Sequence, residues 1–561
     1  YDVAHRLRGL VPLTVYGDVR HGDLEIDTAR GLVYAVREDH RGDGEPVNTL
    51  VAIPLDGSAA RDDAPVRTLV SGTDFVSSPT LSPDGEHLAW ITWDHPDMPW
   101  DNAALHVGDL GPDGTVGDQV VIDGDSGYSV AEPRWTEECE LVHVSNASGF
   151  YNLYRTEGFP RRGTNREGWT SALRTRPLHP ADATFTYPAW QLGPHSFDVL
   201  DGEHLIASWA RDGLWHLGTV RLSNGELEEW NTGWQPMGNV AAAGGRVVML
   251  AGNEMALPSI IEVRRGAVQV LRGSSDVEAL SVGVSFAEPV SWPTSGEQTA
   301  HGFYYPPTST AYQGPEGERP PLVVNVHGGP TAFVHAGYDL GIQYWTSRGF
   351  GYLDVNYRGS FGYGTAYRHS LAGHWGVADV EDVVHGTRYL IDSGLVDPTR
   401  VAVRGVSAGG FTVLGALAAC DLFTAATSVC GVADLGLLAR TTHKFESRYV
   451  LGLTGATSVQ DPVLAERSPI NHVDRIHAPL LLIQGSEDPV VPAEQATTMY
   501  QAVRDRGLPV ALKIFYGEGH GFRMATSIRG ALEAELSFYC QVWGLDRSEE
   551  TSKVAVENLG Q

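Results

Sequence analysis

The first half of the chain repeats a strand-and-turn pattern at a nearly constant interval, and this repeat limits the accessible folds more than any other feature. The segments that begin at Pro79, Pro133 and Pro188 lie 54 and 55 residues apart, and each leads into a turn and a short apolar strand. A second strand and turn close each unit, and aromatic residues recur at matching places. Such four-strand units are typical of β-propeller blades, whereas a β-sandwich would lack the self-similarity.

About five such units fit between Gly17 and Leu280. A propeller closes into a ring because an open ring would leave strand edges unpaired. Either this propeller has few blades, or its natural beginning precedes Tyr1. We expect the second arrangement, a seven-bladed propeller whose N-terminal part is missing from this sequence, and we assign residues 1–284 to this domain.

From about Ala287 the pattern changes to apolar strands that alternate with helices. The segment 379–394 carries apolar residues at helical spacing, with Asp379 as a candidate N-cap and Gly394 as a candidate stop. Alternating strands and helices predict a mostly parallel, doubly wound sheet covered on both faces. We therefore expect an α/β domain over residues 285–561. Six segments are its strand candidates: PLVVNVHGG, GYLDVNYRG, VAVRGVSAG, TAATSVCGV, PLLLIQGSED and VALKIFYGEG.

Composition excludes several functions. A formal charge of −29 disfavours nucleic acid and anionic membranes as partners, because both require basic surface. No apolar run approaches the length of a membrane span. The four cysteines share no metal-ligand spacing, which favours reduced thiols and a cytoplasmic location. The sequence is compatible with a homo-oligomer and implies neither a metal nor an organic cofactor.

The segment RGVSAGGFT places Ser407 on a sharp turn between a β-branched strand and a helix of small residues. Glycines at 405 and 409 allow the strand and the helix to approach closely. This arrangement is typical of a nucleophile elbow, in which the serine hydroxyl stands above the sheet at the N-terminus of the helix. The alternative is a glycine turn that happens to contain a serine, and the motif alone does not decide between them.

A serine hydroxyl needs a base and a group that orients the base. In α/β-hydrolases the chain order is Ser, then Asp or Glu, then His. Asp488 follows an apolar strand in LLLIQGSEDPVVP, and His520 lies between glycines after the next strand. Both are expected at the same edge of the sheet as Ser407. Glu487 is a rival for Asp488, but its side chain is expected to point the other way.

The oxyanion of a tetrahedral intermediate requires N–H donors. The amide of Ala408, directly after the serine, is one candidate. The glycine pair in VVNVHGGPT offers the other, and of Gly328 and Gly329 we favour Gly329. The alternative for the glycine pair is a simple turn.

These motifs, with the two halves in this order, resemble the prolyl oligopeptidase family of serine peptidases, most closely its acylaminoacyl-peptidase branch. The segments that carry the resemblance are SPDGEHLAWITWDHPDMPWD, HGGPT, NYRGSFGYG, GVSAGGF, GSEDPVVP and GEGHGF. The resemblance implies a propeller lid over an α/β-hydrolase domain, with Ser407, Asp488 and His520 as the catalytic triad. In this branch the oxyanion amides correspond to Gly329 and Ala408.

Two positions depart from the wider family. Prolyl oligopeptidases proper use a tyrosine hydroxyl for the oxyanion where this chain has His327, and many members have an arginine where this chain has Val490. That arginine holds a substrate carbonyl, so its absence favours a short acyl part such as one amino acid with a free amine. Asp94 and Asp101 are candidates to hold that amine, and Val491 to line the site, although a solvated blade loop and a core valine are the alternatives.

We therefore expect a serine hydrolase that cleaves short peptides or aminoacyl amides through an acyl-enzyme, as an aminopeptidase or an acylaminoacyl-peptidase. An amidase or esterase acting on a small secondary metabolite, such as an aminoacyl antibiotic, is the first alternative. A catalytically dead propeller scaffold is a remote one, because no member of the triad is missing.

Overall fold

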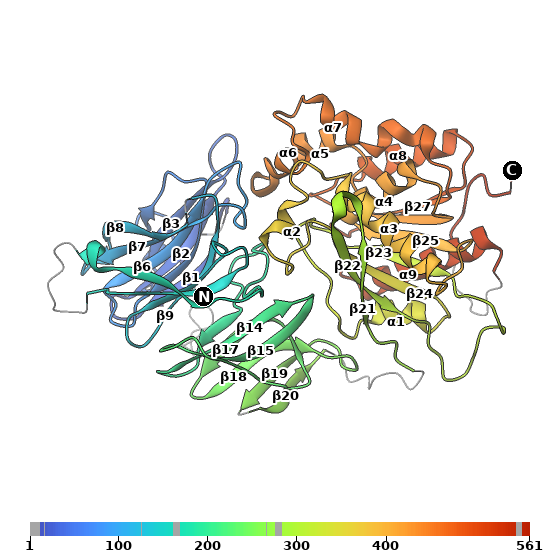
Figure 1. The fold of residues 1–561 in the computed structure, drawn as a ribbon. Coiled ribbons are helices and arrows are strands. Elements are labelled where there is room, and N and C mark those ends of the chain that lie inside the picture. The colour runs from blue at the N-terminus through green and yellow to red at the C-terminus, as the bar shows by residue number, and fades with distance from the viewer. Residues whose placement is uncertain are drawn as a thin grey trace. The chain divides into compact units, whose positions relative to one another are not determined.

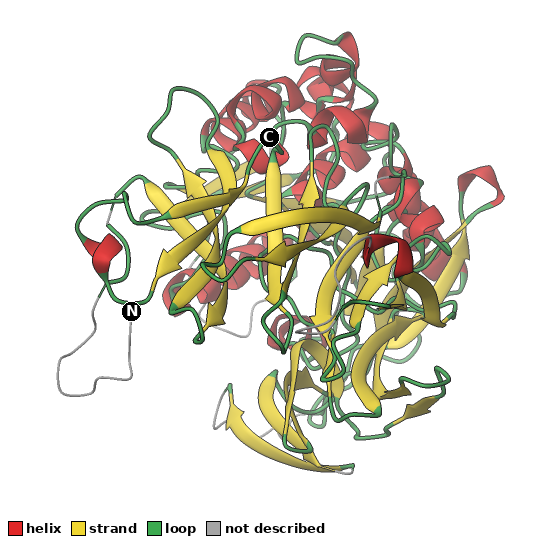
Figure 2. Cartoon of the chain, turned by 90° about the vertical axis from the view of Figure 1, so that its left-hand side faces the viewer, coloured by secondary structure: helices red, strands yellow, loops and turns green. Residues whose placement is uncertain are grey.

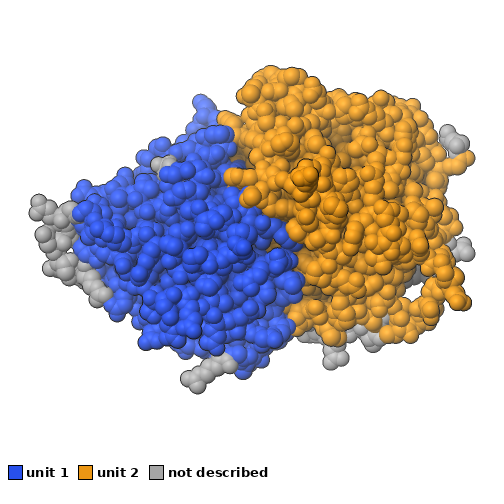
Figure 3. Space-filling model, in the orientation of Figure 1, with its two compact units in different colours: residues 1–251, 259–272, 362–365 blue, residues 252–258, 273–361, 366–561 orange. Residues whose placement is uncertain are grey.

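The computed structural model describes residues 12–15, 17–124, 126–160, 169–264, 266–274, 283–545 and 553–560. The chain divides into two units (Figure 3). Unit 1 is Tyr1–Ala251, Ser259–Arg272 and Gly362–Thr365; unit 2 is Gly252–Pro258, Gly273–Phe361 and Ala366–Gln561. The expected boundary at residues 284 and 285 adjoins residues 275–282, which lie outside the described residues, as do residues 1–11 at the start of the chain.

The repeats of the first half each form one four-stranded sheet. Figures 1 and 2 draw their strands as arrows. In every sheet the four strands neighbour one another in chain order, which is the meander of a propeller blade. The predicted β-propeller is confirmed, and the described part of unit 1 contains five such sheets. Their strands are β1 (Val19–Asp27), β2 (Leu32–Asp39), β3 (Val47–Pro54), β4 (Arg67–Val70); β5 (Phe75–Leu81), β6 (His87–Trp93), β7 (Ala104–Leu110), β8 (Val116–Asp123); β9 (Val130–Trp135), β10 (Leu141–Ser145), β11 (Asn152–Glu157), β12 (Arg174–His179); β13 (Phe197–Val199), β14 (His204–Arg211), β15 (Leu214–Arg221), β16 (Leu227–Glu229); β17 (Gln235–Ala243), β18 (Arg246–Gly252), β19 (Ser259–Arg264) and β20 (Ala267–Gly273).

The recurring aromatic residues are cross-strand partners. Trp90 on β6 stacks on His106 of β7, with ring centroids 5.6 Å apart, and Trp209 of β14 stacks on His216 of β15 at the same distance. The second and third strands of these two blades therefore carry the same stacked pair. Because directly opposed side chains stabilise a sheet, the sequence repeat reflects a repeated contact.

Carboxylates join neighbouring blades through backbone amides. Asp23 accepts a hydrogen bond from the N–H of Ser78 (2.6 Å), and Glu132 accepts one from the N–H of Ser196 (2.6 Å). Burial raises the pKa of both acids, although these hydrogen bonds oppose the shift. Apolar clusters fill the space between blades, for example Tyr34, Leu50, Val76, Leu88 and Trp90 between the first two sheets.

Unit 2 is built on one eight-stranded sheet in the order β21-β22-β24-β23-β25-β26-β27-β28. The first three strands pair antiparallel and those from β24 to β28 pair in parallel. All six predicted strands are present, and β24, β26 and β27 are buried along their whole length. The expected α/β-hydrolase fold is thus confirmed. Its strands are β21 (Glu288–Pro293), β22 (Thr299–Tyr305), β23 (Leu322–Val326), β24 (Gly351–Asn356), β25 (Val401–Val406), β26 (Ala425–Val429), β27 (Leu480–Gly485) and β28 (Val510–Phe515).

Nine α-helices lie in the described residues of the second half. Among them, no helix has both the length and the hydropathy needed to cross a membrane. The helices are α1 (Leu340–Thr346), α2 (Thr365–His369), α3 (Ala378–Asp392), α4 (Ala408–Ala419), α5 (Leu435–Thr441), α6 (Tyr449–Thr454), α7 (Pro462–Arg467), α8 (Glu494–Asp505) and α9 (Ala525–Trp543).

The predicted helix over 379–394 is α3, but its N-cap is Val377 rather than Asp379. Asp379 lies inside the first turn, where its carboxylate accepts hydrogen bonds from the N–H of Gly376 (2.6 Å) and the hydroxyl of Thr412 on α4 (2.5 Å). The prediction of an N-cap was wrong because this side chain joins two helices instead. Burial raises the pKa of Asp379 to about 6.

A buried polar chain crosses the sheet toward α9. Glu535 on α9 forms an ion pair with Arg404 on β25 (3.0 Å), and Arg404 donates to the side-chain oxygen of Asn325 on β23 (2.7 Å). The amide of Asn325 in turn donates to Asp354 on β24 (2.7 Å). Burial raises the pKa of Asp354 to about 7, although the hydrogen bond from Asn325 opposes the shift.

Candidate active site

Ser407 occupies a backbone conformation that residues with a side chain seldom adopt. Its φ is 58° and its ψ is −120°, between the last residue of β25 and the first of α4. Its N–H donates to the carbonyl of Val429 (2.9 Å), and its carbonyl accepts from the N–H of Phe411 (3.1 Å). Such strain persists only where the surroundings impose it, and a strand-to-helix turn with this conformation is typical of a nucleophile elbow.

The glycines beside Ser407 are required by close approach of backbones. A Cβ added to Gly405 would lie 2.4 Å from the carbonyl oxygen of Gly409, and a Cβ added to Gly409 would lie 2.1 Å from that of Val326. No substituent fits at such distances, because the neighbouring atoms belong to the main chain. Gly405 therefore brings β25 and α4 together as expected, whereas Gly409 brings α4 against the end of β23.

Asp488 follows β27 and its side chain is fully enclosed. One carboxylate oxygen accepts from the N–H groups of Val490 (2.9 Å) and Val491 (2.8 Å), and the other accepts from Gln484 (3.2 Å). Burial by itself would raise the pKa of Asp488, but the hydrogen bonds from His520 and from the two amides outweigh it and hold the pKa below its usual range. The carboxylate is therefore ionised at neutral pH.

His520 links Asp488 to Ser407. Its Nδ1 lies 2.7 Å from Oδ2 of Asp488, and its Nε2 lies 2.8 Å from Oγ of Ser407. An ionised carboxylate only accepts hydrogen bonds, so Nδ1 donates and Nε2 is left to accept from the serine hydroxyl. The exposed Glu487 does not take part: its N–H donates to the carbonyl of Glu518 (2.9 Å).

The two candidate oxyanion donors flank this serine. Ala408 contributes the first N–H of α4, and Gly329 lies in the loop after β23 with a φ of 119°. A Cβ added to the neighbouring Gly328 would lie 3.4 Å from Cβ of Ser407, which places this loop directly beside the nucleophile elbow. Within the described ranges, neither amide donates to a protein acceptor.

A layer of side chains holds the 327–330 loop. The ring of Tyr357 stacks on His327, and the imidazole Nε2 of His327 accepts from the hydroxyl of Ser360 (2.8 Å) while its Nδ1 donates to the carbonyl of Gly328 (2.7 Å). Burial lowers the pKa of His327 to about 4, so the ring is neutral at pH 7 and can play both roles.

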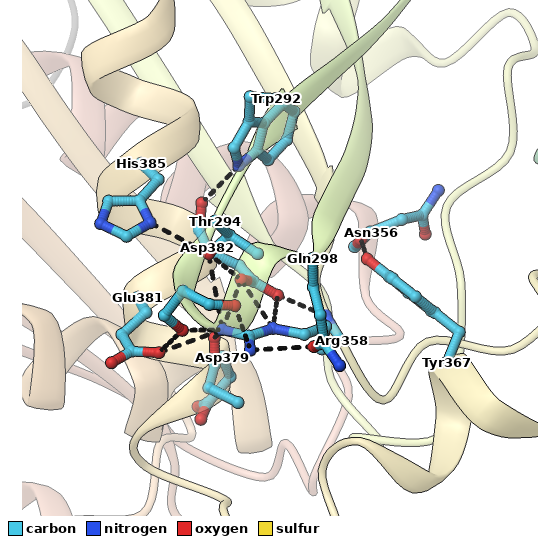
Figure 4. Close-up of polar contacts among 12 residues, drawn as sticks. Trp292, Thr294, Gln298, Asn356, Arg358, Tyr367, Asp379, Glu381, Asp382 and His385 are labelled. Atoms are coloured by element: carbon cyan, nitrogen blue, oxygen red, sulfur yellow. Dashed lines mark hydrogen bonds and ion pairs between the residues drawn. The ribbon is translucent and has the colours of Figure 1, made fainter.

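Arg358, adjacent to Tyr357, is the centre of a dense polar network (Figure 4). Its N–H donates to Oδ2 of Asp382 (2.6 Å) and its Nε donates to Oδ1 (2.9 Å), so one carboxylate holds both the backbone and the side chain. The guanidinium also donates to Glu381 (3.1 Å) on the same helix, α3. Three residues around the β21–β22 turn complete the network, namely Thr294, Ser295 and Gln298.

Cys430 lies beside the Asp488 and His520 pair. It follows β26, its φ is 47°, and only 1% of its surface is exposed. Burial and the nearby Asp488 carboxylate raise the pKa of the thiol to about 12.

The remaining candidates are placed differently. Asp94 and Asp101 lie in the β6–β7 connection of unit 1, and the exposed Asp94 accepts from the N–H of Asp74 (2.5 Å). Val491 has 1% of its surface exposed, and its backbone supports Asp488. Substrate binding by these three residues stays a prediction, which the burial of Val491 does not favour.

Sequence reasoning missed the residues that support the site. Tyr357 and Ser360 lie within NYRGSFGYG, which was noted only for its resemblance, and Asp382 lies on the inner face of a helix identified by its apolar residues. Cys430 was treated with the other cysteines by spacing alone. A signal for Asp382 existed, since an acid among buried helical positions requires a partner.

The strand order, the nucleophile elbow and the Ser, His and Asp arrangement together define an α/β-hydrolase, here linked to a β-propeller. The family model described as the prolyl oligopeptidase family matches residues 336–546. A puromycin-hydrolyzing peptidase from Mycobacterium tuberculosis is 37% identical, with a TM-score of 0.90, over 97% of this chain and 83% of that one. The chain belongs to the prolyl oligopeptidase family of serine peptidases.

Other relatives agree with this assignment. The solved structure of a puromycin hydrolase is 35% identical, with a TM-score of 0.89, over 97% of this chain and 82% of that chain. Dipeptidyl aminopeptidase BIII of Pseudoxanthomonas mexicana and an acylamino-acid-releasing enzyme of Oryza sativa subsp. japonica are each 32% identical, over 36% and 37% of this chain. These matches span only 30% and 28% of the two curated relatives.

Proposed function

We propose that this chain is a serine hydrolase that cleaves the amide bonds of short peptides or aminoacyl amides through an acyl-enzyme. The observation that carries the proposal is the unbroken run of hydrogen bonds from Asp488 through His520 to Ser407, which ends at a strained elbow. A hydroxyl, a base and an orienting carboxylate in this geometry are the requirements for nucleophilic acyl transfer.

In the first half of the reaction, His520 takes the hydroxyl proton as Ser407 attacks the carbonyl carbon. Asp488 keeps the imidazole in the tautomer whose Nε2 can accept that proton and stabilises the imidazolium. The amides of Ala408 and Gly329 stabilise the oxyanion, each contributing about 3 kcal/mol to the lowering of the barrier. His520 then donates the proton to the leaving amine, and the amine departs from the acyl-enzyme.

In the second half, water takes the place of the amine. His520 removes a proton from the water, the resulting tetrahedral intermediate uses the same two amides, and its collapse releases the acid and restores the Ser407 hydroxyl. No group outside Ser407, His520, Asp488 and the two amides is required for proton balance.

Two observations favour a small acyl part. Val490 occupies the position where an arginine would hold a longer peptide, and its N–H is engaged with Asp488. The two solved relatives named above hydrolyse puromycin by their titles, and puromycin is an amide of one amino acid with a free amine. These relatives also support the second candidate, an amidase that acts on an aminoacyl antibiotic.

The proposal extends to the role of the propeller, the oligomeric state and the location of the protein. Residues 1–284 act as a lid for the catalytic domain 285–561, so hydrolysis should fall steeply with peptide length. We also propose that the protein is a homo-oligomer and that it lies in the cytoplasm. Sedimentation of the purified chain and cell fractionation would test them.

A fluorophosphonate probe and a kinetic panel test the proposal together. The probe should label the wild-type chain at Ser407 and leave Ser407→Ala unlabelled. The panel compares single-residue naphthylamides with free and acetylated amines, the matching esters, and puromycin. A preference for free amines supports an aminopeptidase, and a preference for blocked amines an acylaminoacyl-peptidase. Equal labelling of Ser407→Ala would reject Ser407 as the nucleophile, and no turnover of any activated amide would support a dead scaffold.

A further inference from the structure

Three metal-ligating side chains meet at one edge of the central sheet. The Sγ of Cys430, a carboxylate oxygen of Asp488 and a ring nitrogen of His520 all lie within 4.8 Å of one another. Cys430 follows β26, Asp488 follows β27 and His520 follows β28, and these three strands are consecutive in the sheet. The order of the strands in the sheet therefore brings these three side chains together.

We propose that Cys430, Asp488 and His520 form an inhibitory binding site for a thiophilic divalent cation such as Zn²⁺ or Cd²⁺. The inhibition rests on the proposed serine hydrolase activity, whereas the binding of the cation does not.

The donor set determines which cations fit. A thiolate, an imidazole and a carboxylate are all ordinary ligands of Zn²⁺, and the thiolate favours Zn²⁺ and Cd²⁺ over Mg²⁺ and Ca²⁺. Three protein ligands also leave the fourth tetrahedral position open for water. Hard cations should therefore have little effect at concentrations where soft ones inhibit.

The spacing is close to what a metal needs. Zinc lies about 2.0–2.3 Å from its ligands, so donor atoms separated by up to 4.8 Å require shifts of roughly half an ångström to share one ion. The N–H of Cys430 donates to the carbonyl of Ile483 (2.8 Å), which fixes the thiol-bearing residue next to β27. The imidazole, with 24% of its side chain exposed, is where an ion would enter, because the Asp488 side chain is fully enclosed.

Occupancy of the site would disable the base. Nδ1 is the nitrogen that faces Asp488, so a bound cation takes the place of the Nδ1 proton, which then resides on Nε2. The Cys430 thiol releases its proton to solvent on binding. With a hydrogen on Nε2, the imidazole donates to Ser407 instead of accepting from it, and the hydroxyl can no longer be deprotonated.

The test uses the full chain, freed of metal by a chelator, with an aminoacyl naphthylamide as substrate and buffered free Cd²⁺ or Zn²⁺. We expect the wild type to lose activity and to regain it on addition of EDTA, while Mg²⁺ has no effect. The free metal concentration that halves the activity should be at least about tenfold higher for Cys430→Ser than for the wild type, each measured against its own uninhibited rate. The matched control is Cys420→Ser, which changes a partly buried cysteine at the C-terminal end of α4 and should behave as the wild type. Equal half-inhibition of wild type and Cys430→Ser would overturn the proposal.

A second readout does not depend on catalysis. Cadmium bound to a thiolate gives an ultraviolet charge-transfer band, which should form in the wild type and in Cys420→Ser and be absent in Cys430→Ser. His520→Gln, which keeps the thiol, should weaken cadmium binding by about tenfold or more in the same titration. An undiminished band in Cys430→Ser, or unchanged affinity in His520→Gln, would refute the site. If the wild type forms the cadmium–thiolate band but does not hydrolyse any substrate, the metal site is supported and the proposed hydrolase function is rejected.

Discussion

The ring of Tyr357 stacks on the imidazole of His327, with centroids 4.4 Å apart and planes inclined by 18°. The same phenol donates to the carbonyl of His327 (3.2 Å) and lies 3.3 Å from that of Pro330. Between these two carbonyls lies Gly329, the proposed oxyanion donor. Tyr357 is therefore a positioning residue for that donor.

Tyr357→Phe should lower kcat several-fold with little change in KM, because the loop loses about 1 kcal/mol of hydrogen bonding that keeps the donor aimed at the oxyanion. Steady-state kinetics with an aminoacyl naphthylamide measure the effect. The matched control is Tyr367→Phe, which removes a nearby hydroxyl that donates to the carbonyl of Asn356 (2.7 Å). A higher KM with an unchanged kcat would contradict the positioning role.

Asp488→Asn should lower kcat by about 10⁴-fold without unfolding the chain. A carboxamide in this place can donate to Nδ1, which leaves the hydrogen of His520 on Nε2 and removes the base. Glu487→Gln, one residue away and exposed, should retain nearly full activity. Activity assays measure kcat of both variants, and circular dichroism is the control for folding. Comparable losses of kcat in both variants would contradict the catalytic role of Asp488.

Arg358→Met should destabilise the catalytic domain by about 3–5 kcal/mol, because Asp382, whose side chain is 0% exposed, loses the cation that compensates its charge. Arg504→Met, which breaks an exposed pair with Asp505, should change stability little. Chemical denaturation followed by tryptophan fluorescence measures both variants. A double variant Arg358→Met, Asp382→Asn that recovers part of the loss would identify the unpaired charge as the cause.

Asp354 should make the catalytic domain less stable as pH rises toward 8. Burial raises its folded pKa to about 7 from an ordinary value of 3.8, so the protonated acid contributes stability that is fully present below about pH 4 and is lost as pH rises through about 7. Asp354→Asn cannot ionise and still accepts from Asn325. The Tm of this variant should therefore rise relative to that of the wild type between pH 5 and pH 8. An equal difference in Tm at both pH values would show that Asp354 does not titrate in this range.

Gly409→Ala should strongly destabilise the chain or abolish labelling of Ser407 by a fluorophosphonate, because the added methyl group would lie 2.1 Å from the carbonyl oxygen of Val326. Gly452→Ala is the control: it lies in α6 with nothing within 4 Å of the added atom, and should gain about 0.5–1 kcal/mol. Denaturation midpoints and labelling rates measure both.

The sequence alone was enough to identify the elements of the fold. The blade repeat and the six strands of the second half are local patterns, because side-chain periodicity follows from the geometry of a single strand or helix. The strand–Gly-Val-Ser-Ala-Gly–helix segment is a local pattern too, since Gly405 is crowded by Gly409 of the adjoining helix, whereas the crowding of Gly409 by Val326 on β23 depends on the sheet. Asp379 shows the limit of this reasoning: its position predicted an N-cap, but a contact with Thr412 on another helix determines its role.

Tertiary structure alone decided which side chains meet. His520 lies 113 residues from Ser407 in the chain, yet their side chains are 2.8 Å apart, and Cys430 joins them only because β26, β27 and β28 are neighbours. Arg358 and Asp382 likewise meet through the packing of α3 against the β24 loop. Strand order depends on how the whole sheet buries its apolar faces, and no local period records that order.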